Sequence, residues 1–180
     1  FMKKKFFILP LIFFLLILLS FLYILVSERD PYNLPSNLIN RNVPIFETDS
    51  LFKNEKFSSK QKFGEEIILV NFFATWCKPC HDEHKYIMDF ANKEKIKVIG
   101  INYKDNDKKV KEFLKKLGNP YSEIAIDRKG RIAIDWGVYG IPETFIVNSE
   151  GVIKYRHAGQ VTKKIYKKIN SILNEISNVK

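Results

Sequence analysis

The hydrophobic residues of the chain begin with one long uninterrupted run near the N-terminus. Residues 6 to 26 carry no charge, and only Pro10 and Ser20 fall outside the hydrophobic set. A helix of this length extends roughly 31 Å, which is the thickness of the hydrocarbon core of a bilayer. A cleaved signal peptide is the alternative, but its apolar segment is shorter, about 7 to 15 residues. The pattern therefore predicts a transmembrane helix at 6–26.

The charges on either side of this run predict its orientation. Three lysines at positions 3 to 5 precede the run, whereas residues 27 to 30 (SERD) follow it. The positive-inside bias then places the N-terminus in the cytoplasm and the rest of the chain on the other side. In a bacterium this predicts a single-pass inner-membrane protein whose catalytic domain lies in the oxidising periplasm. Prolines among Asn and Ser predict an extended tether at 27–42 and a domain at 43–180.

The first half of this domain alternates two kinds of hydrophobic pattern. Continuous apolar runs at 67–73 and 96–102 predict strands that are buried on both faces. Apolar residues three or four positions apart predict amphipathic helices at 78–93 and 107–117. Gly118 suits the end of the second helix. The order strand, helix, strand, helix implies right-handed crossovers and a parallel half-sheet.

The second half of the domain contains shorter segments. Two runs at 144–147 and 152–156, separated by a turn at Glu150 and Gly151, predict an antiparallel hairpin. Together with the first half, this hairpin implies an α/β protein with a thioredoxin-like fold, a central mixed sheet flanked by helices. The remaining predicted segments are a short strand at 123–126, a short helical or irregular stretch at 131–136 and a final amphipathic helix at 162–177.

Composition and charge exclude several classes of protein. A chain of 180 residues with 46% hydrophobic and 14% aromatic residues can fill one core and is neither disordered nor collagen-like. The net charge is +10, but the lysines are scattered without stacking aromatics. We therefore expect a solvated basic surface and no nucleic-acid partner. Two cysteines cannot form the framework of a small secreted scaffold, so their role is local.

Both cysteines lie in one motif, CKPCH at 77–81, which follows the strand predicted at 67–73. For redox chemistry Cys77 should lie at a helix N-terminus, where unpaired N–H groups and the helix dipole stabilise a thiolate. Lys78 adds a positive charge beside it. Cys80, one turn later and more buried, would then attack the mixed disulfide. The motif predicts a redox-active Cys77–Cys80 disulfide and no other cofactor.

The same letters allow three other interpretations. CxxCH is also the pattern of covalent haem attachment, with His81 as one iron ligand and His84, Met88 or His157 as the other. A zinc site made from the two cysteines, His81 and His84 would crowd four ligands into one and a half turns. The third alternative is a pair of buried cysteines with no chemical role. A buried strand leading directly into the first cysteine favours redox chemistry over all three.

Two acidic residues near the motif or near a proline are candidate site residues. Glu83 follows Cys80 by three residues on the same helical face and could take the proton of that thiol through water. From position alone, a surface glutamate is the simpler interpretation. Glu143 follows Ile141 and Pro142, and the peptide bond between those two could be cis or an ordinary trans bond.

Several further segments resemble one known family. The chain is similar to the membrane-anchored thiol-disulfide oxidoreductases of cytochrome c maturation, the CcmG/DsbE family, over roughly residues 43–161. Five separate blocks make this resemblance more specific than a CxxC motif alone. The blocks are WCKPC (76–80) followed by Glu83 and His84, GINYKD (100–105), LGNPY (117–121), GVYGIPETF (137–145) and YRHAG (155–159).

The resemblance implies a thioredoxin-like reductant and assigns roles to five residues. Cys77 would be the nucleophile, Cys80 the resolving thiol and Pro142 a cis proline that faces the disulfide. Glu83 and Glu143 match acidic positions that the family keeps near its active site, which favours a functional role for both.

The resemblance also implies a substrate groove and partners. The groove would include Trp76, Ile141 and Thr144, with an extended substrate pairing with the Ile141 backbone. The substrate would be apocytochrome c, whose CxxCH must be reduced before haem is ligated, or a maturation thiol protein. The implied electron donor is a membrane thiol carrier of the CcdA/DsbD type. A general periplasmic disulfide reductase or isomerase is the alternative.

Overall fold

The computed structural model describes residues 2–26 and 38–178, which fall into two separate units. The first unit is helix α1 (Met2–Val26), which contains Pro10. Side chains are described over residues 9 to 24 of this helix, and all of them are exposed. Nowhere in the described part of the chain is a helix both long and apolar enough to span a membrane. The transmembrane helix at 6–26 stays a prediction, and most of the predicted tether lies outside the described residues.

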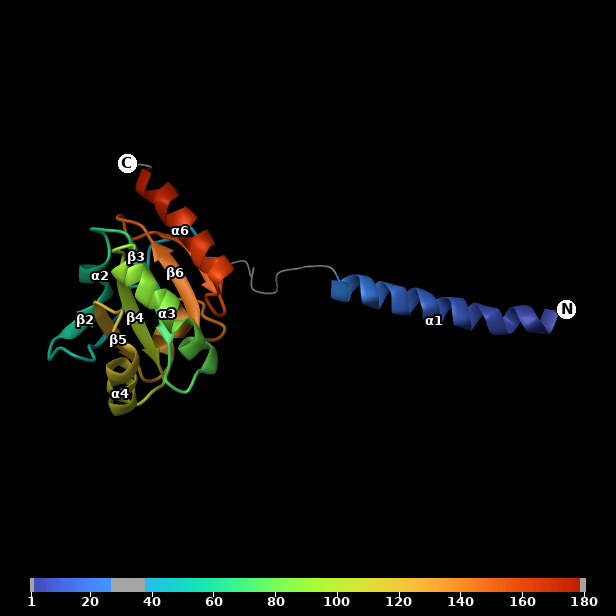
Figure 1. Ribbon diagram of the computed structural model, residues 1–180, viewed down its shortest axis with the longest axis horizontal. Coiled ribbons are helices and arrows are strands. Elements are labelled where there is room, and N and C mark those ends of the chain that lie inside the picture. Colours follow the sequence, from blue (N-terminus) through green and yellow to red (C-terminus); the bar gives the residue numbers. More distant parts are fainter. Residues whose placement is uncertain (1, 27–37, 179–180) are drawn as a thin grey trace. The chain divides into compact units, whose positions relative to one another are not determined.

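The second unit is built on a five-stranded mixed sheet with the order β5–β4–β3–β6–β7 (Figure 1). Strand β3 (Ile68–Phe73) is central and pairs in parallel with β4 (Lys97–Tyr103) and antiparallel with β6 (Glu143–Val147). On the outer sides, β5 (Glu123–Asp127) pairs in parallel with β4, and β7 (Ile153–Ala158) pairs antiparallel with β6. The predicted parallel half-sheet and antiparallel hairpin are thus confirmed.

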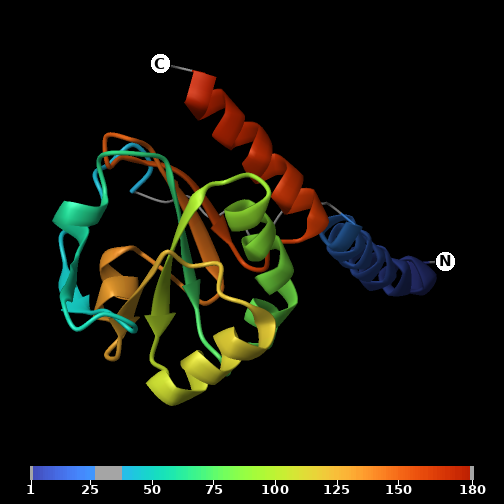
Figure 2. The ribbon, with the colours of Figure 1, turned by 60° about the vertical axis from the view of Figure 1, so that its left-hand side comes forward.

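Helices cover both faces of this sheet, as Figure 2 shows. One face packs against the three longer helices, α3 (Lys78–Asn92), α4 (Asp107–Leu117) and α6 (Lys163–Asn178). The other face packs against α5 (Arg131–Asp135) and the segment around the short helix α2 (Ser59–Lys62). A strand covered on both sides has no solvent face, which explains the continuous apolar run of β3.

Alternate residues of β3 belong to two different hydrophobic clusters. Leu69 and Phe73 face the longer helices, whereas Val70 and Phe72 face the opposite cluster, which contains the fully buried Trp136. This alternation follows from the two-residue period of a strand. Asn71 is the polar exception within β3, and its side chain is 1% exposed.

The helix predicted at 107–117 illustrates how local signals set element ends. The side chain of Asn106 accepts hydrogen bonds from the N–H groups of Lys108 and Lys109, which caps the N-terminus of α4. At the other end Gly118 adopts a φ of 93° and donates its N–H to Leu114 O across 2.9 Å. The other strands and helices predicted for the domain agree with the observed ones to within one or two residues at their ends.

One part of the fold was not predicted. Residues 47–62 form a hairpin of β1 (Glu47–Asp49) and β2 (Lys56–Ser58), followed by α2. Each strand has only three residues, too few to establish a period. Phe57 anchors the hairpin because its side chain is fully buried in the cluster around Trp136.

Candidate active site

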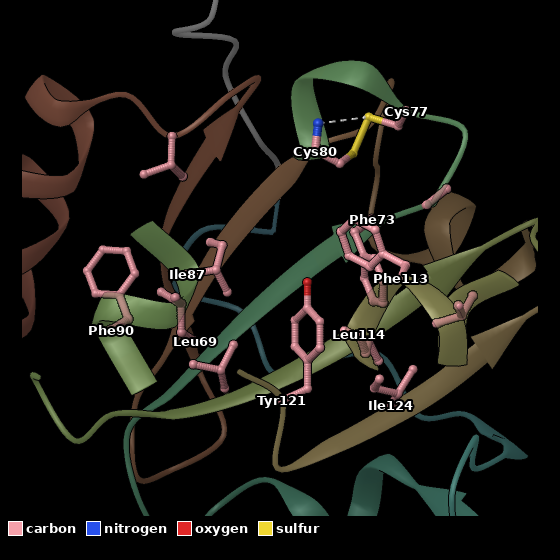
Figure 3. Close-up of a cluster of buried hydrophobic side chains, with 14 of the residues drawn as sticks. Leu69, Phe73, Cys77, Cys80, Ile87, Phe90, Phe113, Leu114, Tyr121 and Ile124 are labelled. Carbon is pink, nitrogen blue, oxygen red and sulfur yellow. Dashed lines mark hydrogen bonds between the residues drawn. A yellow bond between two sulfur atoms is a disulfide. The ribbon is translucent and has the colours of Figure 1, made fainter. Parts of the chain in front are cut away.

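The two cysteines form a disulfide at the N-terminus of α3 (Figure 3). Their Cα atoms are 5.3 Å apart. Cys77 is the N-cap residue of the helix, and its Sγ accepts a hydrogen bond of 3.2 Å from the Cys80 N–H. The sulfur of Cys77 therefore lies where a helix N-terminus would stabilise a thiolate, as the sequence predicted. Both residues are buried, at 5% and 3% exposure, so overall accessibility hardly separates them.

The loop before β6 places a proline beside this disulfide. The Ile141–Pro142 peptide bond is cis, and the Ile141 carbonyl oxygen lies 3.7 Å from Cys77 Sγ. Sheet pairing explains why these residues meet. Phe72, near the end of β3, pairs with Glu143 at the start of β6. The chain leaving β3 toward Cys77 therefore runs past the chain entering β6.

Glu83 lies in the core rather than on the helix surface. Its side chain is 1% exposed. One carboxyl oxygen accepts a 2.9 Å hydrogen bond from Asn71 Nδ2, and the other accepts a 2.7 Å bond from the Val161 N–H. Burial outweighs these two bonds and raises the pKa of Glu83 to about 8. A carboxyl group with this pKa can hold or release a proton near neutral pH.

Glu83 is part of a buried polar network that the sequence analysis missed. The Tyr121 hydroxyl donates to Asn71 Oδ1 across 2.8 Å, and Asn71 Nδ2 also reaches Thr144 Oγ1 at 3.3 Å. Burial raises the pKa of the Tyr121 hydroxyl well above its usual value, which keeps it a neutral donor. The available sequence signal was the single polar residue, Asn71, in the apolar run of β3.

Glu143 is also buried, but its partners differ from those of Glu83. The Arg156 guanidinium contacts both of its carboxylate oxygens, at 2.7 and 3.0 Å, with the two side chains only 4% and 1% exposed. The same carboxylate accepts a 2.8 Å bond from the Tyr139 N–H. Glu143 therefore fixes the loop that leads to Pro142, and its oxygens are occupied by that loop and by Arg156.

The three predicted groove residues have different surroundings. Trp76 is 59% exposed, and its indole N–H donates to Lys104 O across 3.1 Å. Ile141 is half-buried and directs its carbonyl toward Cys77. Thr144 does not line a groove, because its side chain is fully buried and its strand is paired on both sides. Its hydroxyl belongs to the network around Asn71 instead.

The histidines that haem or zinc would require are engaged with the protein. His81 Nε2 lies 2.7 Å from Thr75 O, and His84 Nε2 lies 3.0 Å from Gly118 O. Both rings pack edge-on against Phe113. Among the described residues, no group of three or more His, Cys, Asp or Glu side chains could hold a metal ion. In this structure the two cysteines of CKPCH are joined as a disulfide.

These features define what the site can do chemically. A disulfide at a helix N-terminus can be opened by an incoming thiolate, and the resulting dithiol can open another disulfide. The Ile141 carbonyl oxygen lies beside the Cys77 sulfur of this disulfide. Glu83 lies on the same helix as Cys80 and carries a carboxyl group whose pKa is close to neutral pH.

Comparison with known proteins agrees with this chemistry. Residues 40–175 match the Redoxin family. The chain is 44% identical to a thiol:disulfide interchange protein DsbE of Haemophilus influenzae over 133 residues, which is 74% of this chain and 73% of that one. It is 39% identical to the DsbE protein of Escherichia coli K12 over 169 residues, 92% and 91% of the two chains.

Solved structures share the fold at lower identity. The crystal structure of a putative DsbE from Chlorobium tepidum has a TM-score of 0.64 and 23% identity, covering 75% of this chain and 95% of that one. A secreted thiol-disulfide isomerase from Corynebacterium glutamicum has a TM-score of 0.67 and 17% identity, covering 83% and 95%. These similarities show the thioredoxin-like fold.

Proposed function

The chain belongs to the DsbE (CcmG-type) family of thiol-disulfide oxidoreductases, and we propose that it is the reductant of a cytochrome c biogenesis system. Its substrate is the disulfide of apocytochrome c, or that of a maturation thiol protein which then reduces apocytochrome c. The main support is the placement of Cys77, at the N-terminus of α3 and 3.7 Å from the Ile141 carbonyl, in a chain similar to DsbE over nearly its whole length.

The proposed reaction has two exchange steps. The Cys77 thiolate attacks one sulfur of the substrate disulfide, so a Cys77–substrate disulfide forms and the other substrate sulfur leaves and takes up a proton. Cys80 then loses its proton and attacks the Cys77 sulfur, which forms the Cys77–Cys80 disulfide and releases the second substrate thiol. The substrate gains two electrons and two protons, and the protein is oxidised.

Glu83 would serve the second step. Cys80 must lose a proton before it can attack, and the ionised form of the buried Glu83 carboxyl, three residues further along α3, would accept it directly or through water. A pKa of about 8 makes Glu83 a stronger base than an ordinary glutamate. Glu143 would act indirectly, because with Arg156 it holds the loop that carries Pro142.

The substrate would bind as an extended segment beside the cis proline. The Ile141 backbone would pair with it in the manner of an added strand. The exposed side chains of Trp76 and Tyr139, at 59% and 72% exposure, would flank that segment. Specificity would come from this surface, since the disulfide chemistry does not distinguish between substrates.

Location and electron supply complete the proposal. The apolar run at 6–26 would anchor the protein in the bacterial inner membrane with its N-terminus in the cytoplasm. The domain at 43–180 would then work in the periplasm. After each turnover, the Cys77–Cys80 disulfide would be reduced by a dithiol of a membrane carrier of the CcdA/DsbD type, and the anchor would keep the domain near that donor.

A covalent trap in the native host tests this proposal. The Cys80→Ser variant can form a mixed disulfide through Cys77 but cannot resolve it, so substrates should stay attached and can be identified by mass spectrometry. The Cys77→Ser variant, which lacks the attacking thiol, is the matched control for non-specific capture. We expect apocytochrome c or a maturation thiol protein to dominate. Capture of many unrelated secreted proteins would instead establish a general reductase or isomerase.

A further inference from the structure

All three polar groups of Thr75 are bonded to two side chains from other segments. Thr75 stands two positions before Cys77 in the loop between β3 and α3. Its N–H donates to Asp105 Oδ2 across 2.5 Å, and its hydroxyl donates to Asp105 Oδ1 across 2.9 Å. Its carbonyl lies 2.7 Å from His81 Nε2. Thr75, His81 and Asp105 are called the Thr75 cluster below.

Asp105 is itself held in place by the loop between β4 and α4. Its Oδ1 also accepts a 2.7 Å bond from the Asn106 N–H, and Asn102 Nδ2 lies 3.4 Å from Oδ2. The preceding residue, Lys104, receives the indole N–H of Trp76 on its carbonyl. Lys104 and Asp105 of this loop thus accept hydrogen bonds from Trp76 and Thr75, the two residues before Cys77.

His81 joins the cluster from the other side of the disulfide. It is the last residue of CKPCH and lies in the first turns of α3. Because a carbonyl oxygen only accepts, His81 Nε2 carries the hydrogen in its bond to Thr75 O. The ring is fixed edge-on against Phe113, with centroids 4.8 Å apart. His81 therefore ties the helix after the cysteines back to the loop before them.

This arrangement bears on the reactivity of Cys77. The hydrogen bond from the Cys80 N–H to Cys77 Sγ is 3.2 Å long. It is kept only if the segment before α3, which carries Cys77, stays in place relative to the first turn of the helix. We propose that Asp105 and His81 are positioning residues for thiol-disulfide exchange, which act through Thr75 to hold the Cys77 sulfur at the N-terminus of α3. The proposal concerns the exchange chemistry itself and applies whatever the substrate is.

The test measures how fast Cys77 reacts as a function of pH. In the full chain in detergent, a Cys80→Ser background leaves Cys77 as the single thiol, and its alkylation by iodoacetamide reports the thiolate. Thr75→Val keeps the side-chain shape but loses the hydroxyl bond to Asp105 Oδ1, while the backbone N–H bond to Oδ2 remains. We expect its alkylation rate at pH 7 to fall about three- to tenfold, with the profile displaced to higher pH. Thr75→Ser, which keeps the hydroxyl, should restore the rate.

Asp105 needs a control for its charge. Removing a carboxylate near Cys77 favours the thiolate, which opposes the loss of positioning. Asp107→Asn is the matched control, because Asp107 lies two residues away and pairs with Arg128. If Asp105 acts through Thr75, then Thr75→Val should slow alkylation in the wild-type background and have little further effect in an Asp105→Ala background. Equal effects in both backgrounds would contradict the proposal for Asp105.

His81 provides a test at an exposed position, where a leucine can still pack against Phe113. His81→Leu removes the donor to Thr75 O and should slow alkylation about threefold or more. His81→Gln, whose amide can donate, should recover part of the rate. The cluster would be only structural if His81→Leu and Thr75→Val both lower the thermal midpoint of unfolding and leave the pH profile of alkylation unchanged. That result would leave the proposed function intact, because trapping of partners reports substrate choice.

Discussion

Asn71 Nδ2 donates a hydrogen bond of 2.9 Å to Glu83 Oε1, and each of these side chains is only 1% exposed. The two residues come from the central strand and from the helix that begins at the disulfide. Their contact places a carboxyl group, with a pKa raised to about 8 by burial, inside the same hydrophobic cluster that contains both cysteines. This carboxyl group is therefore buried on the same helix that begins at the disulfide.

Stability should fall with rising pH because of Glu83. Below about pH 4.5 the carboxyl is protonated whether the chain is folded or unfolded. Between about 4.5 and 8 only the unfolded chain releases the proton, so the free energy of unfolding decreases, and above pH 8 it levels off. Relative to Glu83→Gln, which stays neutral, the wild type should lose a few kcal/mol across this window, at about 1.4 kcal/mol for each pH unit. Urea unfolding of the oxidised wild type and of oxidised Glu83→Gln at pH 5 and 8.5 measures this difference. If the free energy of unfolding changes equally in the two proteins between these pH values, the prediction is wrong.

Glu83→Gln should also slow the resolving step. A glutamine cannot accept the Cys80 proton, so the mixed disulfide with a model substrate should persist roughly 10- to 100-fold longer while the first attack by Cys77 is unchanged. Quenched single-turnover reactions separate the two steps. Asp82→Asn is the matched control, since Asp82 is an adjacent exposed acid paired with Lys78. An unchanged lifetime in Glu83→Gln would remove Glu83 from the catalytic residues.

The Arg156–Glu143 pair should be essential for the loop beside the disulfide. Arg156→Met leaves a buried carboxylate without its cation, which should cost about 3–5 kcal/mol of stability. Adding Glu143→Gln to that variant should recover part of the loss, because no unpaired charge then remains. In thiol-disulfide assays, Arg156→Met should raise KM more than it lowers kcat if this loop binds the substrate as proposed. If the double variant is no more stable than Arg156→Met, the ion-pair explanation is wrong.

Gly100 should not tolerate a larger side chain. A Cβ atom there would lie 2.9 Å from ring atoms of both Phe73 and Tyr121, whose rings stack with centroids 4.6 Å apart. Gly100→Ala should therefore cost about 1–3 kcal/mol, measured by urea unfolding. Gly140→Ala is the control, because a Cβ at Gly140 has no neighbour within 4 Å. Equal stabilities of the two variants would show that the rings move apart without cost.

Glu83 and Thr144 show why the site was predicted only in part. Spacing places Glu83 on the same helical face as Cys80, but a surface glutamate remained the simpler interpretation of its position. The structure buries it because that face packs on the sheet and because Val161, far along the chain, supplies an N–H. For Thr144 the error was the reverse. It adjoins the cis-proline loop in sequence, but β6 lies inside the sheet, so its side chain has no access to the surface.

The sequence by itself determined most elements of this domain, though not the hairpin of β1 and β2 or the short helix α2, and it indicated the CxxC motif as the location of the chemistry. Strand and helix periods, the caps of α4 and the CxxC motif after β3 are local signals, written in residues a few positions apart. Only the tertiary structure decided which distant residues meet. Pro142 reaches Cys77 because β3 pairs with β6, and Asp105 reaches Thr75 because β3 pairs with β4. Such contacts depend on sheet pairing and burial, which are properties of the folded chain as a whole, whereas a hydrophobic pattern records only which face of each element is covered.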